Sequence, residues 1–133
     1  MKYLVSAALF TICLLMISWK PVAQIKGPKG KKTYDRLCSG CHMPDAKGIP
    51  NFSPALSGSK IVVGSGDRLI RVLLKGSEEL KNLPGHDNKS GMPAQANLKD
   101  RRIANLLTYI RSNFGNKAPA ITADEVRIER SKL

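Results

Sequence analysis

The sequence predicts an all-α domain of three to four short helices joined by long loops. Apolar side chains recur at helical spacing in three stretches, residues 30–41, 67–75 and 98–114. Glycine and proline are frequent between these stretches, which is typical of loops. The one short β-branched run, Ile61 to Val63, does not alternate with helices as strands of an α/β protein do. One small domain without internal repeats accounts for the 133 residues.

The N-terminal segment predicts a secretory signal peptide. A short positively charged start precedes the apolar run Leu4 to Ile17, and the following segment ends in Pro-Val-Ala before Gln24. The run is shorter than the roughly 20 residues that span a bilayer comfortably. An uncleaved anchor stays open as an alternative, because Pro21 is unfavourable three residues before a cleavage site. We therefore expect residues 1–23 to direct export to the periplasm and residues 24–133 to form the domain.

The first helix of the domain is expected to begin near Gly30. Four side chains fall at i, i+3, i+4 and i+7 and therefore share one helix face: Tyr34, Leu37, Cys38 and Cys41. Residues 43–66 contain repeated glycine and proline and are predicted to be loop throughout.

The second helix is predicted over residues 67–75, with Gly76 as its stop. Residues 77–96 are expected to return to loop. The strongest periodic pattern predicts a helix over residues 98–114 that begins at an Asn97 cap and ends at glycine.

A short terminal helix is predicted at the C-terminus. Thr122 and Glu125 have the spacing of a capping box, which would start a helix over residues 123–130.

Cys38-Ser39-Gly40-Cys41-His42 carries the chemistry of the chain. Two thiols separated by two residues and followed by an imidazole form the attachment signature of c-type haem. Each thiol can add to one vinyl group of the haem, and the next residue ligates the iron. The motif predicts one haem c per chain, with Cys38 and Cys41 as covalent anchors and His42 as the first axial ligand.

Two other uses of the motif fit the sequence less well. A thioredoxin-like dithiol would need a βαβ setting, which the pattern lacks. Zinc held by the motif and His86 would require the adjacent Cys41 and His42 to point into one tetrahedron. With the leader removed, Cys38 and Cys41 are the remaining thiols. We therefore expect the haem, and not a disulfide, to stabilise the fold, and the haem-free chain to be largely unfolded.

Met92 is the predicted second axial ligand. Two of the four methionines lie in the leader, and Met43 is too close to His42 to reach the opposite haem face. Met92 lies in a loop rich in glycine and proline, and Pro93 restricts the backbone that presents it. His86 as a second imidazole and an open iron position are the alternatives.

The chain resembles the class I cytochromes c over nearly all of residues 24–133. Besides the haem motif, Pro54-Ala55-Leu56-Ser57-Gly58 is similar to the family's Pro-x-Leu-x-Gly segment, and Gly91-Met92-Pro93-Ala94 to its distal methionine segment. The resemblance implies the class I cytochrome c fold, with helices and long loops wrapped around one covalent haem. It also implies that the Pro54 carbonyl orients His42 and that Leu56 packs on the haem.

The resemblance extends to residues 104–116, which are similar to the C-terminal helix of the family and overlap the helix predicted over residues 98–114. This helix is expected to cross the first one at Gly30, where the missing side chain permits close approach. Its sequence looks most like that of cytochromes serving periplasmic quinoprotein dehydrogenases. The implied function is an exported one-electron carrier that is not an enzyme by itself. A cytochrome subunit or dedicated acceptor of a periplasmic dehydrogenase, and a haem-based peroxidase or gas sensor, are the alternatives.

The charge of the chain predicts an acidic partner. The formal net charge is +12, and without Lys2 and Lys20 of the leader it is +10. Such a charge steers association with an acidic redox protein, either a dehydrogenase or a terminal oxidase, or with an anionic membrane surface. Nucleic acid is not expected for an exported protein whose basic stretches lack interleaved aromatic residues. The protein is predicted to be a monomer.

Basic residues gather at several places that could form a docking face. Lys47 and Lys89 lie close in sequence to the two ligand segments and are candidates for a docking rim. Two clusters lie elsewhere in the sequence: Lys29, Lys31 and Lys32, and Lys99, Arg101 and Arg102.

Overall fold

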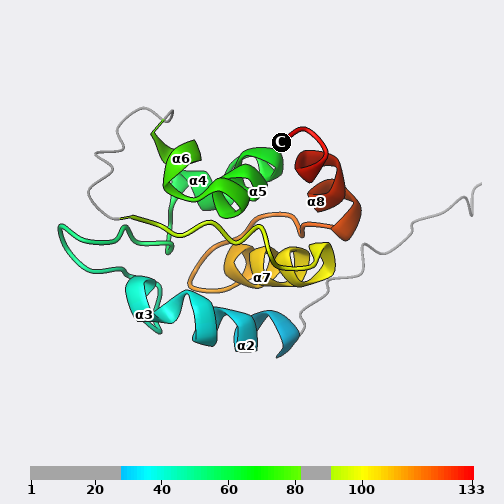
Figure 1. Cartoon of the computed structure of the whole chain (residues 1–133). Helices are drawn as coiled ribbons and strands as arrows, with labels where there is room; N and C mark the ends of the chain where they lie inside the picture. The colour runs from blue at the N-terminus through cyan, green and yellow to red at the C-terminus, as the bar shows by residue number, and fades with distance from the viewer. Residues whose placement is uncertain (1–27, 82–90) are drawn as a thin grey trace, which may run out of the picture.

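The computed structural model describes residues 28–81 and 91–133, and this part of the chain is helical (Figure 1). Its extended pairing is a single isolated bridge between Ile49 and Ser53. The predicted signal peptide, His86 and Lys89 lie outside the described residues. Within the described part, no helix is long and apolar enough to cross a membrane.

Helices α2 (Pro28–Leu37) and α7 (Asp100–Ser112) cross and form the base of the fold (Figure 1). At the crossing, a Cβ on Gly30 would lie 2.3 Å from the Asn105 carbonyl oxygen. Only glycine allows this approach, so the predicted crossing at Gly30 is confirmed. Tyr34 is fully buried there and its ring packs on Tyr109 and Phe114, with centroids 5.8 and 4.9 Å away.

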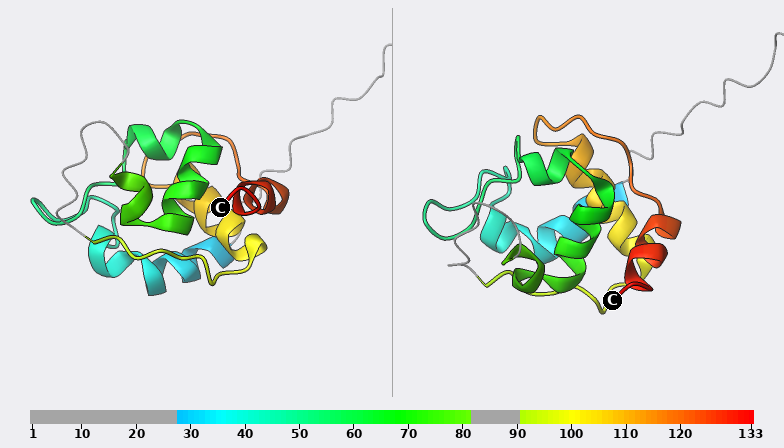
Figure 2. Two further views of the ribbon diagram at one scale, coloured as in Figure 1. Left: turned by 45° about the horizontal axis from the view of Figure 1, so that its top comes forward. Right: turned by 90° about the horizontal axis from the view of Figure 1, so that it is seen from above.

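Helix α5 (Gly66–Lys75) confirms the second predicted helix, and Gly76 ends it with a φ of 61°. Its apolar face is buried toward the core, which explains why the periodic pattern identified it. Helix α8 (Ala123–Arg130) begins with the predicted capping box and packs on both α5 and α7 (Figure 2). Arg71 of α5 donates to the buried Glu129 of α8 at 2.8 Å, which joins the two helices.

Two single-turn helices occupy segments that the sequence predicts to be loop. Helix α4 (Lys60–Val63) contains the β-branched run, and α6 (Ser77–Leu80) directly follows Gly76. The prediction of continuous loop is wrong at both places. Burial explains α4, because Val62 is 1% exposed and becomes part of the core only when the segment coils onto α5 and α7.

The predicted ends of the last long helix are also wrong. Its N-cap is Lys99 without a side-chain cap hydrogen bond, and not Asn97. The helix ends at Ser112, because Asn113 is extended and Phe114 has a φ of 57°. This reversal of the backbone turns Phe114 back onto the ring of Tyr34, a tertiary contact that periodicity does not report.

The first predicted helix is divided at Cys38. After α2, a separate turn, α3 (Ser39–His42), continues the chain to the end of the motif. Met43 follows with a φ of 65°, and its carbonyl accepts a 2.6 Å hydrogen bond from the Tyr34 hydroxyl. The motif therefore ends at a backbone reversal that is held by the core of the α2–α7 crossing.

Candidate haem site

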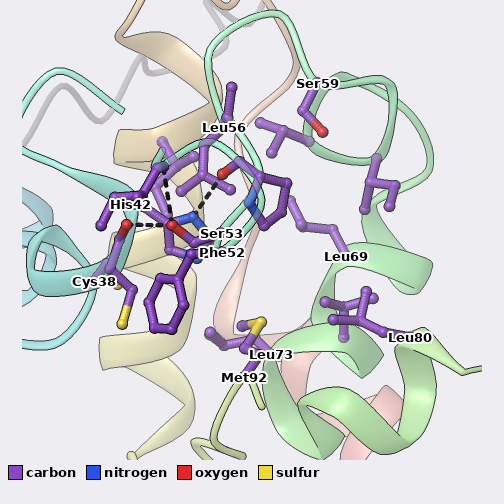
Figure 3. Close-up of a pocket in the computed structure, with 18 of the residues that line it drawn as sticks. Cys38, His42, Phe52, Ser53, Leu56, Ser59, Leu69, Leu73, Leu80 and Met92 are labelled. Atoms are coloured by element: carbon purple, nitrogen blue, oxygen red, sulfur yellow. Dashed lines mark hydrogen bonds between the residues drawn. The ribbon is translucent and has the colours of Figure 1, made fainter. Parts of the chain in front are cut away.

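A cavity of about 780 Å³ lies between the loop that follows α3 and helices α5 and α6 (Figure 3). Figure 3 shows His42 and Ser53 on one side of the cavity and Leu69 and Leu80 on the other. Pockets of roughly 300–1,000 Å³ are usual for organic cofactors. All six residues predicted to form the site line this cavity: Cys38, Cys41, His42, Pro54, Leu56 and Met92.

His42, the last residue of α3, is held by its Nδ1 atom. This atom lies 2.9 Å from the carbonyl oxygen of Pro54, the hydrogen bond that the resemblance implied (Figure 3). Because a carbonyl only accepts, Nδ1 must carry the proton and donate it. The other ring nitrogen, Nε2, is left with its lone pair and is able to bind a metal.

The Pro54 carbonyl is itself positioned by a tightly bonded loop. The amide of Gly48 donates to the His42 carbonyl at 3.0 Å, and Ile49 and Ser53 form the isolated bridge. The Ser53 hydroxyl donates to the Cys41 carbonyl, so the loop is tied directly to the motif. A Cβ on Gly48 would lie 2.7 Å from the Pro54 oxygen.

Sequence reasoning missed Gly48 and Ser53 as part of the site. Gly48 has a φ of 70°, where a side chain is strained, but its place among other glycines and prolines predicted only a loop. For Ser53, the sequence holds no signal, because its hydroxyl acts through a contact with a residue 12 positions away.

The two cysteines have different environments. Cys38 is buried at 9% exposure, whereas Cys41 is exposed, and both are free thiols. Burial raises the pKa of the Cys38 thiol to about 11. Among residues 28–81 and 91–133, no group of three or more histidine, cysteine or acidic side chains is arranged to hold a metal ion. The fourth ligand of the zinc alternative, His86, lies outside the described residues.

Met92 is anchored through its own backbone carbonyl and through the segment that follows it. Its carbonyl accepts hydrogen bonds from the Ser77 amide at 2.9 Å and from the Ser77 hydroxyl at 3.2 Å. Further along, the Gln95 amide donates to the Leu73 carbonyl at 2.9 Å. Gly76 makes this docking possible, because a Cβ there would lie 2.3 Å from the Met92 oxygen. The partly buried Met92 side chain packs against the core at the cavity wall.

Comparison with known proteins identifies the family. The family model described as Cytochrome c matches residues 28–114, from the start of α2 to Phe114, just after α7. The chain belongs to the cytochrome c family. The class I cytochrome c fold predicted from the sequence is thereby confirmed, and so is the covalently attached haem c with iron as cofactor.

Relatives of this cytochrome fall into two groups. Cytochrome c-552 of Thermus thermophilus is 35% identical over 112 residues, covering 77% of this chain and 85% of that protein. The cytochrome c subunit of alcohol dehydrogenase (quinone) from Gluconacetobacter polyoxogenes is 32% identical over 103 residues, which are 73% of this chain and 21% of that subunit. The fructose dehydrogenase cytochrome subunit of Gluconobacter japonicus is 29% identical over 115 residues, which are 80% of this chain and 23% of that subunit.

The walls of the cavity fit a haem. They are largely apolar, and they bring two free thiols, a thioether and an imidazole with an available Nε2 to one space, which is the donor set of a c-type haem. The apolar part consists mainly of aliphatic side chains: Leu56, Ile61, Val62, Leu69, Val72, Leu73, Leu80, Leu107 and Ile110.

The described lining offers little for peroxidase chemistry. Its cationic side chains are Lys47 and Lys60, and it includes neither arginine nor a second histidine. A peroxidase needs a distal acid or base over an accessible iron position. The family to which this cytochrome belongs includes electron carriers and dehydrogenase cytochrome subunits, which agrees with the predicted function and its first alternative.

Proposed function

We propose that this cytochrome is an exported one-electron carrier in which Cys38 and Cys41 hold the haem and His42 and Met92 ligate its iron. When bound, the haem supplies the Fe(II)/Fe(III) couple. The observation that carries the ligand assignment is the hydrogen bond from His42 Nδ1 to the Pro54 carbonyl. This bond leaves Nε2 of His42 free to bind the iron, and Met92 lines the same cavity.

The residues of the chain keep the site rigid. Pro54 holds the His42 ring, and the backbone hydrogen bonds with Ser77 and Leu73 hold Met92 and the residues that follow it. Ligands fixed in this way stay in place when the charge of the site changes by one. Little rearrangement then accompanies electron transfer. Leu56 and the other aliphatic side chains give the cavity a largely apolar wall, which favours burial of an apolar cofactor.

The partner is proposed from the relatives and the charge. Two related proteins are cytochrome subunits of an alcohol dehydrogenase and a fructose dehydrogenase. The proposed donor is therefore a quinoprotein dehydrogenase with an acidic docking face, and the protein acts as a monomer after residues 1–23 are removed. Service as an integral subunit of such a dehydrogenase is the second candidate, favoured by the 73% of this chain that aligns with the alcohol dehydrogenase subunit.

Mass and colour test the anchors. Protein produced with the haem-attachment machinery is expected to be red and heavier than the polypeptide of residues 24–133 by one haem. The Cys38→Ala and Cys41→Ala double variant is expected to lack the covalent adduct. Colourless wild-type protein with the mass of bare polypeptide would contradict the proposal.

Replacement of Met92 by alanine tests the second ligand. The iron-to-thioether charge-transfer band is expected to disappear, and the reduction potential to fall, because a thioether favours ferrous iron. The matched control is His86→Ala, which should keep both the band and the potential. Loss of the band in the control and its retention in Met92→Ala would transfer the ligand role to His86.

A further inference from the structure

Arg111 of α7 is a buried cation that the proposed function does not use. It is 3% exposed, although arginine is rarely buried so completely without an ionised partner. Its Nε atom donates to the Pro119 carbonyl at 2.7 Å, and its Nη1 atom donates to the carbonyls of Val62 and Gly64 at 2.7 and 3.0 Å. Three backbone carbonyls therefore hold the guanidinium in one place.

No carboxylate neutralises this charge in the part of the chain that the structure describes. The ion pairs of that part do not include Arg111. Burial lowers the pKa of Arg111, and Glu125 has a smaller opposing effect. Glu125 is itself exposed and bonded to Thr122 in the capping box of α8. Because arginine stays protonated in proteins and carbonyls carry no net charge, the guanidinium keeps a full positive charge.

The segment between α7 and α8 covers this charge. It returns along α7 after the helix ends (Figure 1), and the Ala118 amide donates to the Arg111 carbonyl at 3.1 Å. The Thr108 hydroxyl donates to the Ile121 carbonyl at 3.1 Å and accepts from the Ile121 amide at 2.9 Å. This segment lies beyond residue 114, where the match to the family model ends. Water and salt screen a charge covered in this way less than a charge at the surface.

The guanidinium lies directly behind the wall of the haem cavity. Val62, whose carbonyl accepts from Arg111, lines the cavity, and so does Ile110, the residue before Arg111. Arg111 is not part of the lining. Val62 thus borders the cavity and binds the guanidinium through its carbonyl, so the charge is close to the haem without being able to act as a ligand.

We propose that Arg111 raises the reduction potential of the haem through its buried charge. This inference rests on the proposed function and assigns a residue that tunes it. Reduction adds one electron to the haem site. A fixed positive charge behind the Val62 wall attracts that electron, and this attraction is strong because the space between them is poorly screened. Arg111 therefore favours the ferrous state of the haem.

Redox titration of the haem-loaded protein tests the proposal. Arg111→Met removes the charge, and the midpoint potential is expected to fall. Arg111→Gln, which can still donate to a carbonyl, is a second neutral variant in case methionine prevents folding. Arg111→Lys keeps the charge, and its potential is expected to stay closer to that of wild type than to that of either neutral variant. The shifts should persist at about 0.5 M salt, because a buried charge is poorly screened.

Two control variants separate the local charge from net charge and from stability. Arg68→Gln removes an exposed cation of α5 that does not line the haem cavity, and it should shift the potential less than half as far as Arg111→Met. Thr108→Val removes the hydrogen bonds to Ile121 without changing any charge. It should lower the free energy of unfolding and leave the potential unchanged.

Three results would overturn the proposal. These are an equal shift in Arg68→Gln and Arg111→Met, a potential in Arg111→Lys as low as in the neutral variants, and a fall in Thr108→Val as large as in Arg111→Met. In the last case, loosening of the fold would explain the change. The iron-to-thioether band of wild type reports the proposed function separately. Its absence contradicts the proposed ligands, whereas an intact band with unchanged potentials in both neutral variants contradicts the role of Arg111 alone.

Discussion

His42 depends on a backbone carbonyl, and that carbonyl depends on a glycine. The Pro54 oxygen has room next to the His42 ring because Gly48 has no side chain and adopts a φ of 70°. The ring is therefore oriented by main-chain geometry, and the identity of residue 48 controls it from outside the motif. Substitutions at Gly48 are a more direct probe of ring orientation than substitutions of Pro54, since any residue at 54 supplies a carbonyl.

Replacement of Gly48 by alanine is predicted to loosen the proximal ligand. The new Cβ would lie 2.3 Å from the Ser53 oxygen and 2.7 Å from the Pro54 oxygen, so this loop must shift. We expect a loss of about 1–3 kcal/mol in unfolding free energy, and a lower reduction potential or a partly high-spin spectrum. Urea unfolding and visible spectroscopy of the haem-loaded variant measure both.

Gly40→Ala is the matched control for this prediction. Gly40 lies in helix α3, where an added Cβ would meet no atom within 4 Å, and its φ is negative. Alanine there should leave stability unchanged or raise it slightly. If both alanine variants kept the wild-type spectrum and stability, Gly48 would have no role in positioning His42.

At the scale of elements, α8 is joined to the rest of the fold by an ion-pair network. Glu129 is buried at 4% exposure and accepts from Arg71 of α5 and from Lys132. The hydrogen bond from Lys132, followed by that from Arg71, holds the pKa of Glu129 below its ordinary value of 4.5. The same Arg71 also pairs with Asp67 and Glu79, so one guanidinium links three segments.

Glu129→Gln is predicted to destabilise the protein in a pH-dependent way. A carboxyl group whose pKa is lowered by folding stabilises the fold above its unfolded pKa, and this contribution disappears as the pH falls through the folded value. At pH 7 we expect the variant to be less stable by about 1–3 kcal/mol. The difference from wild type should shrink below about pH 4.5.

Urea unfolding at a series of pH values measures this difference. Asp124→Asn on the same helix is the control. Both side chains of the Asp124–Arg127 ion pair are exposed, so this pair should contribute little to the unfolding free energy. A difference between wild type and Glu129→Gln that stayed constant from pH 7 to pH 3 would show that the Glu129 charge does not stabilise the fold.

On the scale of the whole molecule, the main core is incomplete without the haem. The cavity of about 780 Å³ is lined by residues of α5, α6 and α7 and of the loop after α3. Three of the aliphatic side chains that line it, Leu56, Ile61 and Leu80, are only partly buried by the described part of the chain, so a bound haem would complete their burial. A chain of this size buries a smaller fraction of its surface on folding than a larger one, so loss of buried apolar area affects its stability strongly.

The haem-free protein is accordingly predicted to lack a cooperative fold. Chain produced without the haem-attachment machinery should show little helical circular dichroism and no sharp thermal transition, whereas the haem-loaded protein should show both. Free haem added to the Cys38→Ala and Cys41→Ala double variant separates occupancy of the cavity from covalent attachment. A cooperative transition in the haem-free chain at physiological temperature would contradict the prediction.

Contacts within a few residues of one another were predictable from the sequence alone. The proposed anchors Cys38 and Cys41, the proposed ligand His42, helix α5 and the capping box of α8 each follow from local spacing. Met92 was proposed as a ligand by eliminating the other methionines, and the role of Pro54 was inferred from the family resemblance. The errors, at α4, α6 and the ends of α7, occurred where packing against distant residues decided the backbone.

The chain sequence by itself determined the cofactor chemistry and the helical class, because adjacent residues encode the haem motif and periodicity encodes amphipathic helices. Only the tertiary structure decided how Gly48 supports His42, how Gly76 receives the Met92 backbone, and how carbonyls of two distant segments bind Arg111. These features join segments separated along the chain. Their geometry arises when those segments pack together, so it has no pattern in the linear sequence.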